Sequence, residues 1–412
     1  MSLRTPHTSP SSRAAHPAHP GQKARFDVVI VGAGLVGASL ALALSRPDSG
    51  LSVALVDAAE PAPLKTDSTA WDSRVYALSP GSVDFLAQLG AWQVIDPQRL
   101  SPVCAMRVFG DGKGSRLDFS AYECAVAELA WIVESGRVQT ALWQGLRSAR
   151  SVALHCPARC VRLLDSENAI ELDGGSILRA DLLVAADGSR SWLRQAAGIA
   201  LDVQAYDQLG VVANFECAYA HDGIARQWFG EQGILAWLPL PGNRVSMVWS
   251  TPDAHARSLL AMAPDSFARC VSRAGGEALG TMRLLGTPAA FPLARQIATT
   301  TVRAGLALVG DAAHTVHPLA GQGVNLGFSD ARVLAEILLQ REKVRSCGDL
   351  RLLRRYQRAR AEDILAMRLA TDSLARLFGS RAGAVAWLRN TGLNLTAASP
   401  VLKTLLARRA LG

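Results

Sequence analysis

The chain has 412 residues, of which 49% are apolar and 19% charged, and its formal net charge is +8 at pH 7. This composition excludes a disordered chain, a collagen and a coiled coil, and the length suggests two or three domains. The seven cysteines are scattered and odd in number. They favour reduced thiols in a cytosol over a disulfide framework or a zinc site.

Much of the positive charge lies at the two ends of the chain. Four cations precede the first acidic residue, Asp27, and five arginines lie between residues 351 and 360. No nucleic-acid motif or interleaving of aromatic and basic residues accompanies them, so we expect no nucleic-acid partner. We interpret the arginine cluster as a solvated helix face, with an anionic bilayer as the alternative contact.

An uncharged stretch over residues 28–45 contains the first motif. Its β-branched start leads into Gly32, Gly34 and Gly37, and its end is rich in helix formers. A strand, a tight turn and a helix fit this order better than a membrane span. The glycines let backbone N–H groups approach a pyrophosphate at the helix N-terminus. Asp57 ends the next apolar strand, where a carboxylate can bind a ribose.

Further elements follow in chain order. We predict a helix over 79–89, a hairpin over 103–119, a helix over 138–149, a β-meander over 152–184, a strand-rich block over 206–250, a buried strand over 306–309 and mostly helices from residue 327. The initial βαβ unit implies a parallel sheet, and the inserted strand block implies a second, antiparallel domain.

Two more strands end on an acidic residue. The first runs out into Asp187, and the second leads through Gly310 into Asp311. Alone, the first of these is an ordinary turn. The second is followed by a glycine-rich loop and a helix start, over residues 317–327. An acid at such a strand end can bind a sugar hydroxyl, and free N–H groups of the loop suit a polarised ring edge.

In this order and at these separations, the three segments resemble the flavoprotein aromatic hydroxylases of the para-hydroxybenzoate hydroxylase superfamily. Residues 72–79, which begin Asp72-Ser73-Arg74, and residues 317–327 are similar to two signatures of the ubiquinone-biosynthesis ring hydroxylases, the UbiH/UbiF family. The resemblance covers about residues 26 to 412.

The resemblance implies an α/β fold: a Rossmann-like FAD-binding domain with an inserted antiparallel-sheet substrate domain and a C-terminal helical region. The implied segments are a disordered arm at 1–25, FAD-binding parts at 26–100, 126–200 and 291–345, a substrate-domain hairpin at 101–125, the substrate domain at 201–290, and C-terminal helices at 346–412.

It also implies which residues bind one FAD molecule. Gly32, Gly34 and Gly37 would face the pyrophosphate, Asp57 would face the adenosine ribose, and Arg74 would reach the pyrophosphate or the ring. Gln139 would contact the ribityl chain, Gly310 and Asp311 would hold the ribityl or pyrophosphate side, and Asp187 belongs to a segment that the nicotinamide cofactor also approaches. The residues along the flavin ring would be Pro318, Gly321, Gln322 and Gly323. Asp57 stands where most relatives have Glu. We expect no metal.

The implied reaction is FAD-dependent hydroxylation of the ring of a polyprenylated phenol in ubiquinone biosynthesis, with NAD(P)H and O₂ and through a flavin C4a-hydroperoxide. The alternatives are hydroxylation of another small aromatic compound and a non-catalytic FAD-fold binding protein. Because all three FAD segments are present, the latter is disfavoured.

No residue identifies itself as a catalytic base, and His221 is a weak candidate only. We expect a cytoplasmic protein that does not span the membrane and meets its substrate at the inner membrane surface or on other ubiquinone-pathway proteins. The hydroxylated ring carbon, the choice of NADH or NADPH, the prenyl chain length and the oligomeric state stay open.

Overall fold

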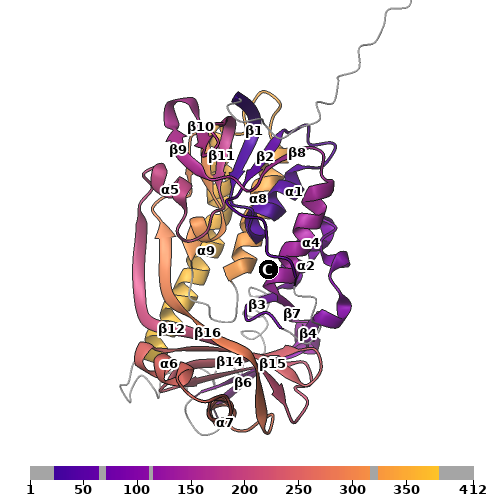
Figure 1. Cartoon of the computed structure of the whole chain (residues 1–412), viewed down its shortest axis with the longest axis vertical. Helices are drawn as coiled ribbons and strands as arrows, with labels where there is room; N and C mark the ends of the chain where they lie inside the picture. Colours follow the sequence, from indigo (N-terminus) through magenta and orange to yellow (C-terminus); the bar gives the residue numbers. More distant parts are fainter. Residues whose placement is uncertain (1–22, 65–70, 111–114, 316–322, 380–412) are drawn as a thin grey trace, which may run out of the picture.

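The computed structural model describes residues 23–64, 71–110, 115–315 and 323–379. Within these ranges the chain forms two large sheets, which lie one above the other in Figure 1, and a small three-stranded sheet. The long strands β12 (Leu201–Cys217) and β16 (Met282–Ala298) run side by side between the two halves. The structure is thus a layered α/β arrangement with two distinct sheets.

The upper sheet is mainly parallel. Among the described residues its order is β17-β18-β11-β1-β2-β8, and β10 pairs with both β11 and β9. The strands of this sheet are β1 (Lys23–Val31), β2 (Val53–Val56), β8 (Val152–His155), β9 (Cys160–Leu164), β10 (Ala169–Leu172), β11 (Ile177–Ala185), β17 (Val302–Arg303) and β18 (Leu306–Leu308). The predicted meander is wrong in its first strand, because β8 pairs in parallel with β2.

Alternating side chains of the upper sheet fill two cores. On β1, Val28 and Ile30 face one core, whereas Val29 and Val31 face the other. The first core lies against α1 (Leu35–Leu44), α4 (Ser135–Ser148) and α8 (Gly323–Leu339), which supply many of its buried side chains. Successive side chains of a strand point to opposite faces, so a sheet buried on both faces needs the continuous apolar runs seen in the sequence.

The lower sheet is mainly antiparallel, in the order β19-β16-β12-β15-β14-β13-β5-β6 within the described residues. Its other strands are β5 (Ala105–Phe109), β6 (Arg116–Ser120), β13 (Ile224–Gly230), β14 (Gly233–Leu240), β15 (Arg244–Pro252) and β19 (His314–Thr315). The predicted hairpin is confirmed as β5 and β6. The division of the chain into domains at the predicted boundaries stays a prediction.

Helices α6 (Asp253–Leu260) and α7 (Pro264–Ala274) cover the lower sheet at the bottom of Figure 1. Phe267 and Val271 of α7 pack with Trp237 and Trp249 of the sheet in one buried cluster. The sequence patterns did not single out these helices.

The remaining elements lie outside the two large sheets. They are β3 (Val75–Leu78), β4 (Ser101–Val103) and β7 (Ala130–Glu134) of the small sheet, the helices α2 (Pro80–Gln88), α3 (Ala121–Cys124), α5 (Trp192–Ala196) and α9 (Leu350–Gly379), and the 3₁₀ turns η1 (Trp92–Val94), η2 (Pro97–Arg99), η3 (Asp165–Glu167) and η4 (Gly310–Ala312). The predicted helix over 79–89 is confirmed as α2, and the Ser79 side chain caps it by accepting the Ser82 N–H.

Four parallel strands end at one edge of the upper sheet. Val31 of β1 pairs with Val56 of β2 on one side and with Ala185 of β11 on the other. Ala185 in turn pairs with Leu308 of β18. The turns that follow these four strands therefore meet at the same edge, where ligands of open parallel sheets bind.

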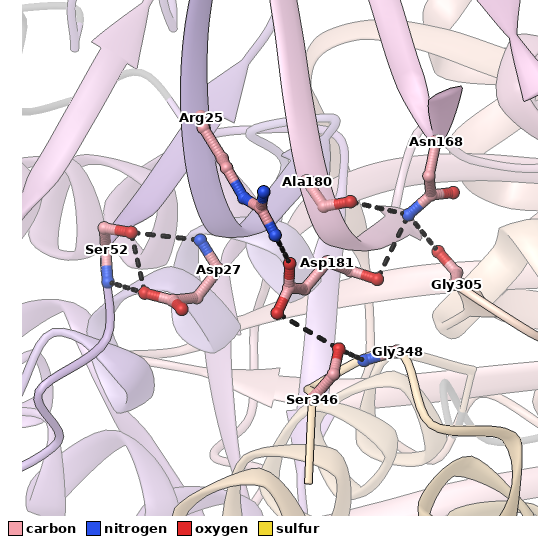
Figure 2. A network of polar contacts seen from close by, with 9 residues as sticks. All are labelled: Arg25, Asp27, Ser52, Asn168, Ala180, Asp181, Gly305, Ser346 and Gly348. Carbon is pink, nitrogen blue, oxygen red and sulfur yellow. Dashed lines mark hydrogen bonds and ion pairs between the residues drawn. The ribbon is translucent and has the colours of Figure 1, made fainter. Parts of the chain in front are cut away.

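A polar network holds the amino-terminal side of the same strands (Figure 2). The side-chain nitrogen Nδ2 of Asn168 lies 2.8, 3.1 and 3.2 Å from the backbone carbonyl oxygens of Ala180, Asp181 and Gly305. The Asp181 carboxylate also accepts a hydrogen bond of 3.0 Å from the Ser346 hydroxyl. The network thereby fastens β11 to the segments that precede β18 and α9.

Replacing Asn168 tests this network. We expect Asn168→Ala to lower the free energy of unfolding by about 1–3 kcal/mol, because backbone carbonyls lose their donor. Asn168→Gly should cost less, because the native φ of +46° is unstrained for glycine. Urea denaturation measures both. Unfolding curves that match wild type for both variants would contradict a stabilising role.

Candidate active site

A cavity of about 940 Å³ lies at the carboxyl edge of the parallel strands. Its walls come from the turns after β1, β2, β11 and β18, from the start of α4, and from the faces of β12, β14, β15 and β16. Such a volume is typical of a binding site for a cofactor or substrate. The cavity therefore lies between the upper and the lower sheet.

The glycine turn after β1 forms one wall of the cavity. Gly32 has a φ of +104°, and a Cβ there would lie 2.4 Å from the Ala186 carbonyl oxygen. A Cβ on Gly37 would lie 1.8 Å from the carbonyl oxygen of Gly32, so both positions require glycine. Gly34 differs, because a Cβ there would meet nothing within 4 Å and the residue lines the cavity.

Helix α1 begins at this turn with no side-chain cap. The uncapped N–H groups of its first turn and the helix dipole favour an anion at this place. Because Gly34 has no side chain, a phosphate can approach the backbone closely. The turn thus has the shape and the polarity of a pyrophosphate site.

Three side chains hold the peptide groups of Ala33, inside the glycine turn. Asp57 Oδ2 accepts the Ala33 N–H at 2.6 Å. Gln139 Nε2 and Trp143 Nε1 donate to the Ala33 carbonyl oxygen at 2.6 and 3.0 Å. Asp57 and Gln139 also line the cavity. Their contacts with the ribose and the ribityl chain stay predictions. In this structure both of them bind the chain's own backbone.

Trp143 is not among the residues predicted from sequence motifs. It lies four residues after Gln139 on α4, and residues at this spacing share a helix face. That spacing was the signal that could have pointed to it.

Arg74 lines the cavity on the side of the small sheet. Its guanidinium carbon lies 5.3 Å from the centre of the Phe291 ring. Asp72 fixes the local backbone, because its carboxylate accepts the N–H of Arg74 at 2.9 Å and that of Gly136 at 3.2 Å. The Asp72-Ser73-Arg74 segment is therefore a turn that presents one cation to the cavity.

A buried ion pair supports this turn. Arg99 Nη2 contacts Glu134 Oε1 at 2.7 Å, and both side chains are buried. The same Glu134 oxygen accepts the Asp72 N–H at 2.8 Å. A buried pair of this kind destabilises the fold strongly when one partner is removed, so the place of Arg74 depends on side chains outside the cavity.

Asp187 lines the cavity and binds the first turn of helix α5, whose N-cap residue is Ser191. Its carboxylate accepts the Leu193 N–H at 3.1 Å and the Ser191 hydroxyl. Burial raises the pKa of Asp187, and these two hydrogen bonds oppose that shift. The predicted Asp-Gly segment is thus a structured turn at the cavity.

The Gly310–Asp311 turn forms another wall of the cavity. Gly310 has a φ of +58°, which favours glycine. The Asp311 side chain is exposed toward the cavity. The walls of the cavity restrict its hydration and so raise its pKa, while the charges of His314 and Arg74 act in the opposite direction. A carboxylate here can accept hydrogen bonds from ligand hydroxyl groups.

Behind this turn lies a buried pair that the sequence analysis did not predict. His314 Nε2 donates to Asp330 Oδ2 at 2.7 Å, and both side chains are buried. Burial alone would lower the pKa of His314, but the Asp330 carboxylate outweighs it and raises the pKa. His314 thus pairs with a carboxylate. In the described part of the chain no cluster of three metal-ligating side chains exists.

Not every predicted site residue reaches the cavity. Gly323 lines it at the start of α8, whereas Pro318, Gly321 and Gln322 lie outside the described residues. His221 is not among the lining residues. Its ring nitrogens contact the Leu240 carbonyl oxygen at 2.7 Å and the Gly223 N–H at 3.1 Å, so they hold a turn of the lower sheet.

The wall contributed by the lower sheet is apolar. Its lining residues are Gly210, Val212, Leu238, Val248, Phe291, Pro292, Leu293, Ala294 and Thr315. Among these, the Thr315 hydroxyl is the polar side-chain group, and none is a carboxylate, an amine or an imidazole. The charged lining residues thus all lie outside the lower sheet; we call their side of the cavity the polar end and the lower-sheet side the apolar end.

These residues fit FAD. The uncapped start of α1 and the open space beside Gly34 suit its pyrophosphate, and the carboxylates of Asp57 and Asp311 suit its hydroxyl groups. A family described as FAD binding domain matches residues 25–368. The chain belongs to this FAD-binding family. The predicted family, the α/β fold and the FAD cofactor are therefore confirmed.

Relatives of this flavoprotein match over nearly their whole length. The 3-demethoxyubiquinol 3-hydroxylase of Escherichia coli is 36% identical, over 94% of this chain and 98% of the relative. The ubiquinone hydroxylase UbiL of Rhodospirillum rubrum is 36% identical, over 94% and 89%. The fold is similar to that of PqsL, a probable FAD-dependent monooxygenase from Pseudomonas aeruginosa, with a TM-score of 0.74, 24% identity and coverage of 90% and 100%. The predicted FAD-dependent aromatic-ring monooxygenase is confirmed.

The pKa of His314 predicts how stability depends on pH. The folded chain holds a proton that the unfolded chain releases near the ordinary pKa of 6.5. This stabilisation is fully present below that pH and is lost as the pH rises through the raised pKa. As the pH rises above 6.5 we therefore expect the Tm of wild type to fall more steeply than that of His314→Gln. Parallel declines in thermal melts would refute a charged His314.

Proposed function

We propose that this flavoprotein hydroxylates the aromatic ring of a polyprenylated phenol in ubiquinone biosynthesis, with NAD(P)H and O₂ as co-substrates. The names of its full-length relatives in Escherichia coli and Rhodospirillum rubrum support the substrate class. When bound, FAD accepts electrons from NAD(P)H and activates O₂, and side chains do not perform this chemistry.

The division of the cavity into a polar and an apolar end is the observation that carries this proposal. The polar end, at the strand ends of the upper sheet, binds and orients FAD. Its proposed contacts are Gly32, Gly34, Gly37, Asp57, Arg74, Gln139, Asp187, Gly310, Asp311, Pro318, Gly321, Gln322 and Gly323. The apolar end holds the substrate ring and excludes water, which protects oxygen transfer from release of peroxide.

The chemistry of the apolar wall bears on the predicted base. Val212, Leu238 and Val248 cannot accept a proton, and His221 holds a turn elsewhere. We infer that an electron-rich ring reacts here without a base from the lower sheet. The tasks left to these side chains are to orient the ring and to keep the site dry.

A polyprenyl substrate lives in a bilayer, so we propose that the protein meets it at the inner membrane surface or on another protein of the pathway. Through the described ranges, none of the helices combines the length and apolarity needed to cross a bilayer. As the cations that contact the membrane surface we propose Lys403, Arg408 and Arg409, which lie outside these ranges.

A gene deletion tests the function directly. We expect the deletion strain to accumulate a quinone precursor that lacks one ring hydroxyl, detected by mass spectrometry. Wild type on a plasmid should restore the quinone, whereas Gly34→Val should not. An added Cβ at Gly34 meets no protein atom within 4 Å, so this variant should fold but obstruct the proposed phosphate position. Normal quinone in the deletion strain would favour another small aromatic substrate.

Vesicle binding tests the membrane contact. We expect the full chain to bind anionic vesicles at low salt and to be released by salt, because each cation near an anionic surface contributes about 1 kcal/mol. A variant with glutamine at Lys403, Arg408 and Arg409 should bind more weakly than wild type. Absence of wild-type binding at low salt would instead assign delivery of the substrate to a protein partner.

A further inference from the structure

A cluster of buried charges lies behind the Gly310–Asp311 turn, with Asp330 of α8 at its centre. Asp330 is fully buried. Its Oδ2 accepts hydrogen bonds from the Gly310 N–H at 2.9 Å and from His314 Nε2 at 2.7 Å. Its Oδ1 accepts a hydrogen bond from Arg360 Nε at 2.8 Å. One carboxylate thus joins both ends of the turn to a side chain of helix α9.

The turn is held on its other side as well. The buried Arg194 guanidinium donates to the Ala312 carbonyl oxygen at 3.0 Å. Gly310 and His314, the residues at the two ends, both contact Asp330. Asp311 lies between them and is the acidic side chain of this turn that faces the cavity. Its carboxylate is therefore placed by groups that never touch the ligand space.

Arg360 is an unexpected member of this cluster, because it belongs to α9. Its side chain is only 3% exposed, and it also pairs with Asp363 of the same helix. No described residue of α9 lines the cavity. Burying an ion pair is expensive, and apolar residues of the same volume often stabilise a fold as well or better. A role beyond stability would account for its presence.

We propose that Arg360 is a positioning residue for FAD binding: through Asp330 it fixes the turn that directs the Asp311 carboxylate toward the cofactor. Without the guanidinium, the Asp330 carboxylate keeps only His314 as a charged partner and can rotate away from the Gly310 N–H. The C-terminal helix is then part of the cofactor site without contacting the cofactor. This inference rests on FAD binding by the family and is independent of which phenol is hydroxylated.

Three single variants of the full chain test it. Arg360→Met removes the charge at similar length, Arg360→Lys keeps the charge, and Tyr356→Phe is the matched control. Tyr356 is a buried residue of the same helix, whose hydroxyl donates to the Leu308 carbonyl oxygen at 3.0 Å and not to the turn. The readouts are the Tm of the apoprotein and the Kd of FAD, measured by flavin fluorescence.

We expect Arg360→Met to raise the Kd of FAD about tenfold, the scale of one charged hydrogen bond, and Arg360→Lys to restore most of the affinity. Tyr356→Phe should lower the Tm but leave the Kd within about twofold of wild type. If Arg360→Met changes the Tm alone, the proposal is overturned. If Arg360→Met does not fold, Arg360→Gln, which also removes the charge, takes its place in both experiments, and a wild-type Kd of FAD in that variant overturns the proposal.

A double-mutant cycle identifies the route. Asp311→Asn should weaken FAD binding in the wild-type and Arg360→Lys backgrounds and cost much less in the Arg360→Met background, because the carboxylate is already misplaced there. Additive losses would mean that Arg360 acts on another part of the site, which contradicts the proposal. Wild type that fails to bind FAD would instead contradict the cofactor assignment, so the two failures are distinguishable.

Discussion

The in-register end of four parallel strands is the constraint on which the rest of the structure depends. Val31, Val56, Ala185 and Leu308 are neighbours across the sheet. The segments that follow these residues are far apart in the chain but emerge side by side. A slip of one residue in any of these pairings would turn the side chains of that strand to the opposite face. The cavity, the glycine turn and the acidic turns all follow from this register.

Many polar side chains around the cavity are committed to the protein's own backbone. Asp57 and Gln139 hold Ala33, Asp187 holds Leu193, and Asp330 holds Gly310. Such contacts fix the shape of the site before a ligand arrives, which reduces the entropy lost on binding. They also explain why the site contains so many buried polar groups at a cost to stability.

The two sheets contribute opposite chemistry to one cavity. The upper sheet offers helix starts, carboxylates and open backbone, which suit a charged cofactor. The lower sheet offers the apolar faces of four strands, which suit an aromatic ring. A reactive oxygen species must be kept from water, and a dry wall opposite a polar cofactor site meets that need. The long strands β12 and β16 join the two halves and supply part of this wall.

Sequence patterns predicted the polar half of the site better than the apolar half. The glycine spacing, Asp57, Arg74 and Asp311 all belong to short motifs. The structure brings Gly32, Gly34 and these three side chains to the cavity, whereas Gly37 does not line it. The side chains of the apolar wall have no motif, because any alternating strand presents such residues. His221 was singled out by residue type alone, and its environment assigns both ring nitrogens to a turn.

By itself, the sequence determined the strand–turn–helix segments, the family and the cofactor, because these depend on residue types within a few positions of one another. Only the tertiary structure decided that Trp143 holds the glycine turn and that Arg360 reaches Asp330, 30 positions away in the chain. Both contacts require the packing of whole helices against the sheet. Local periodicity specifies which face of a helix is buried, but not which distant polar group that face will meet.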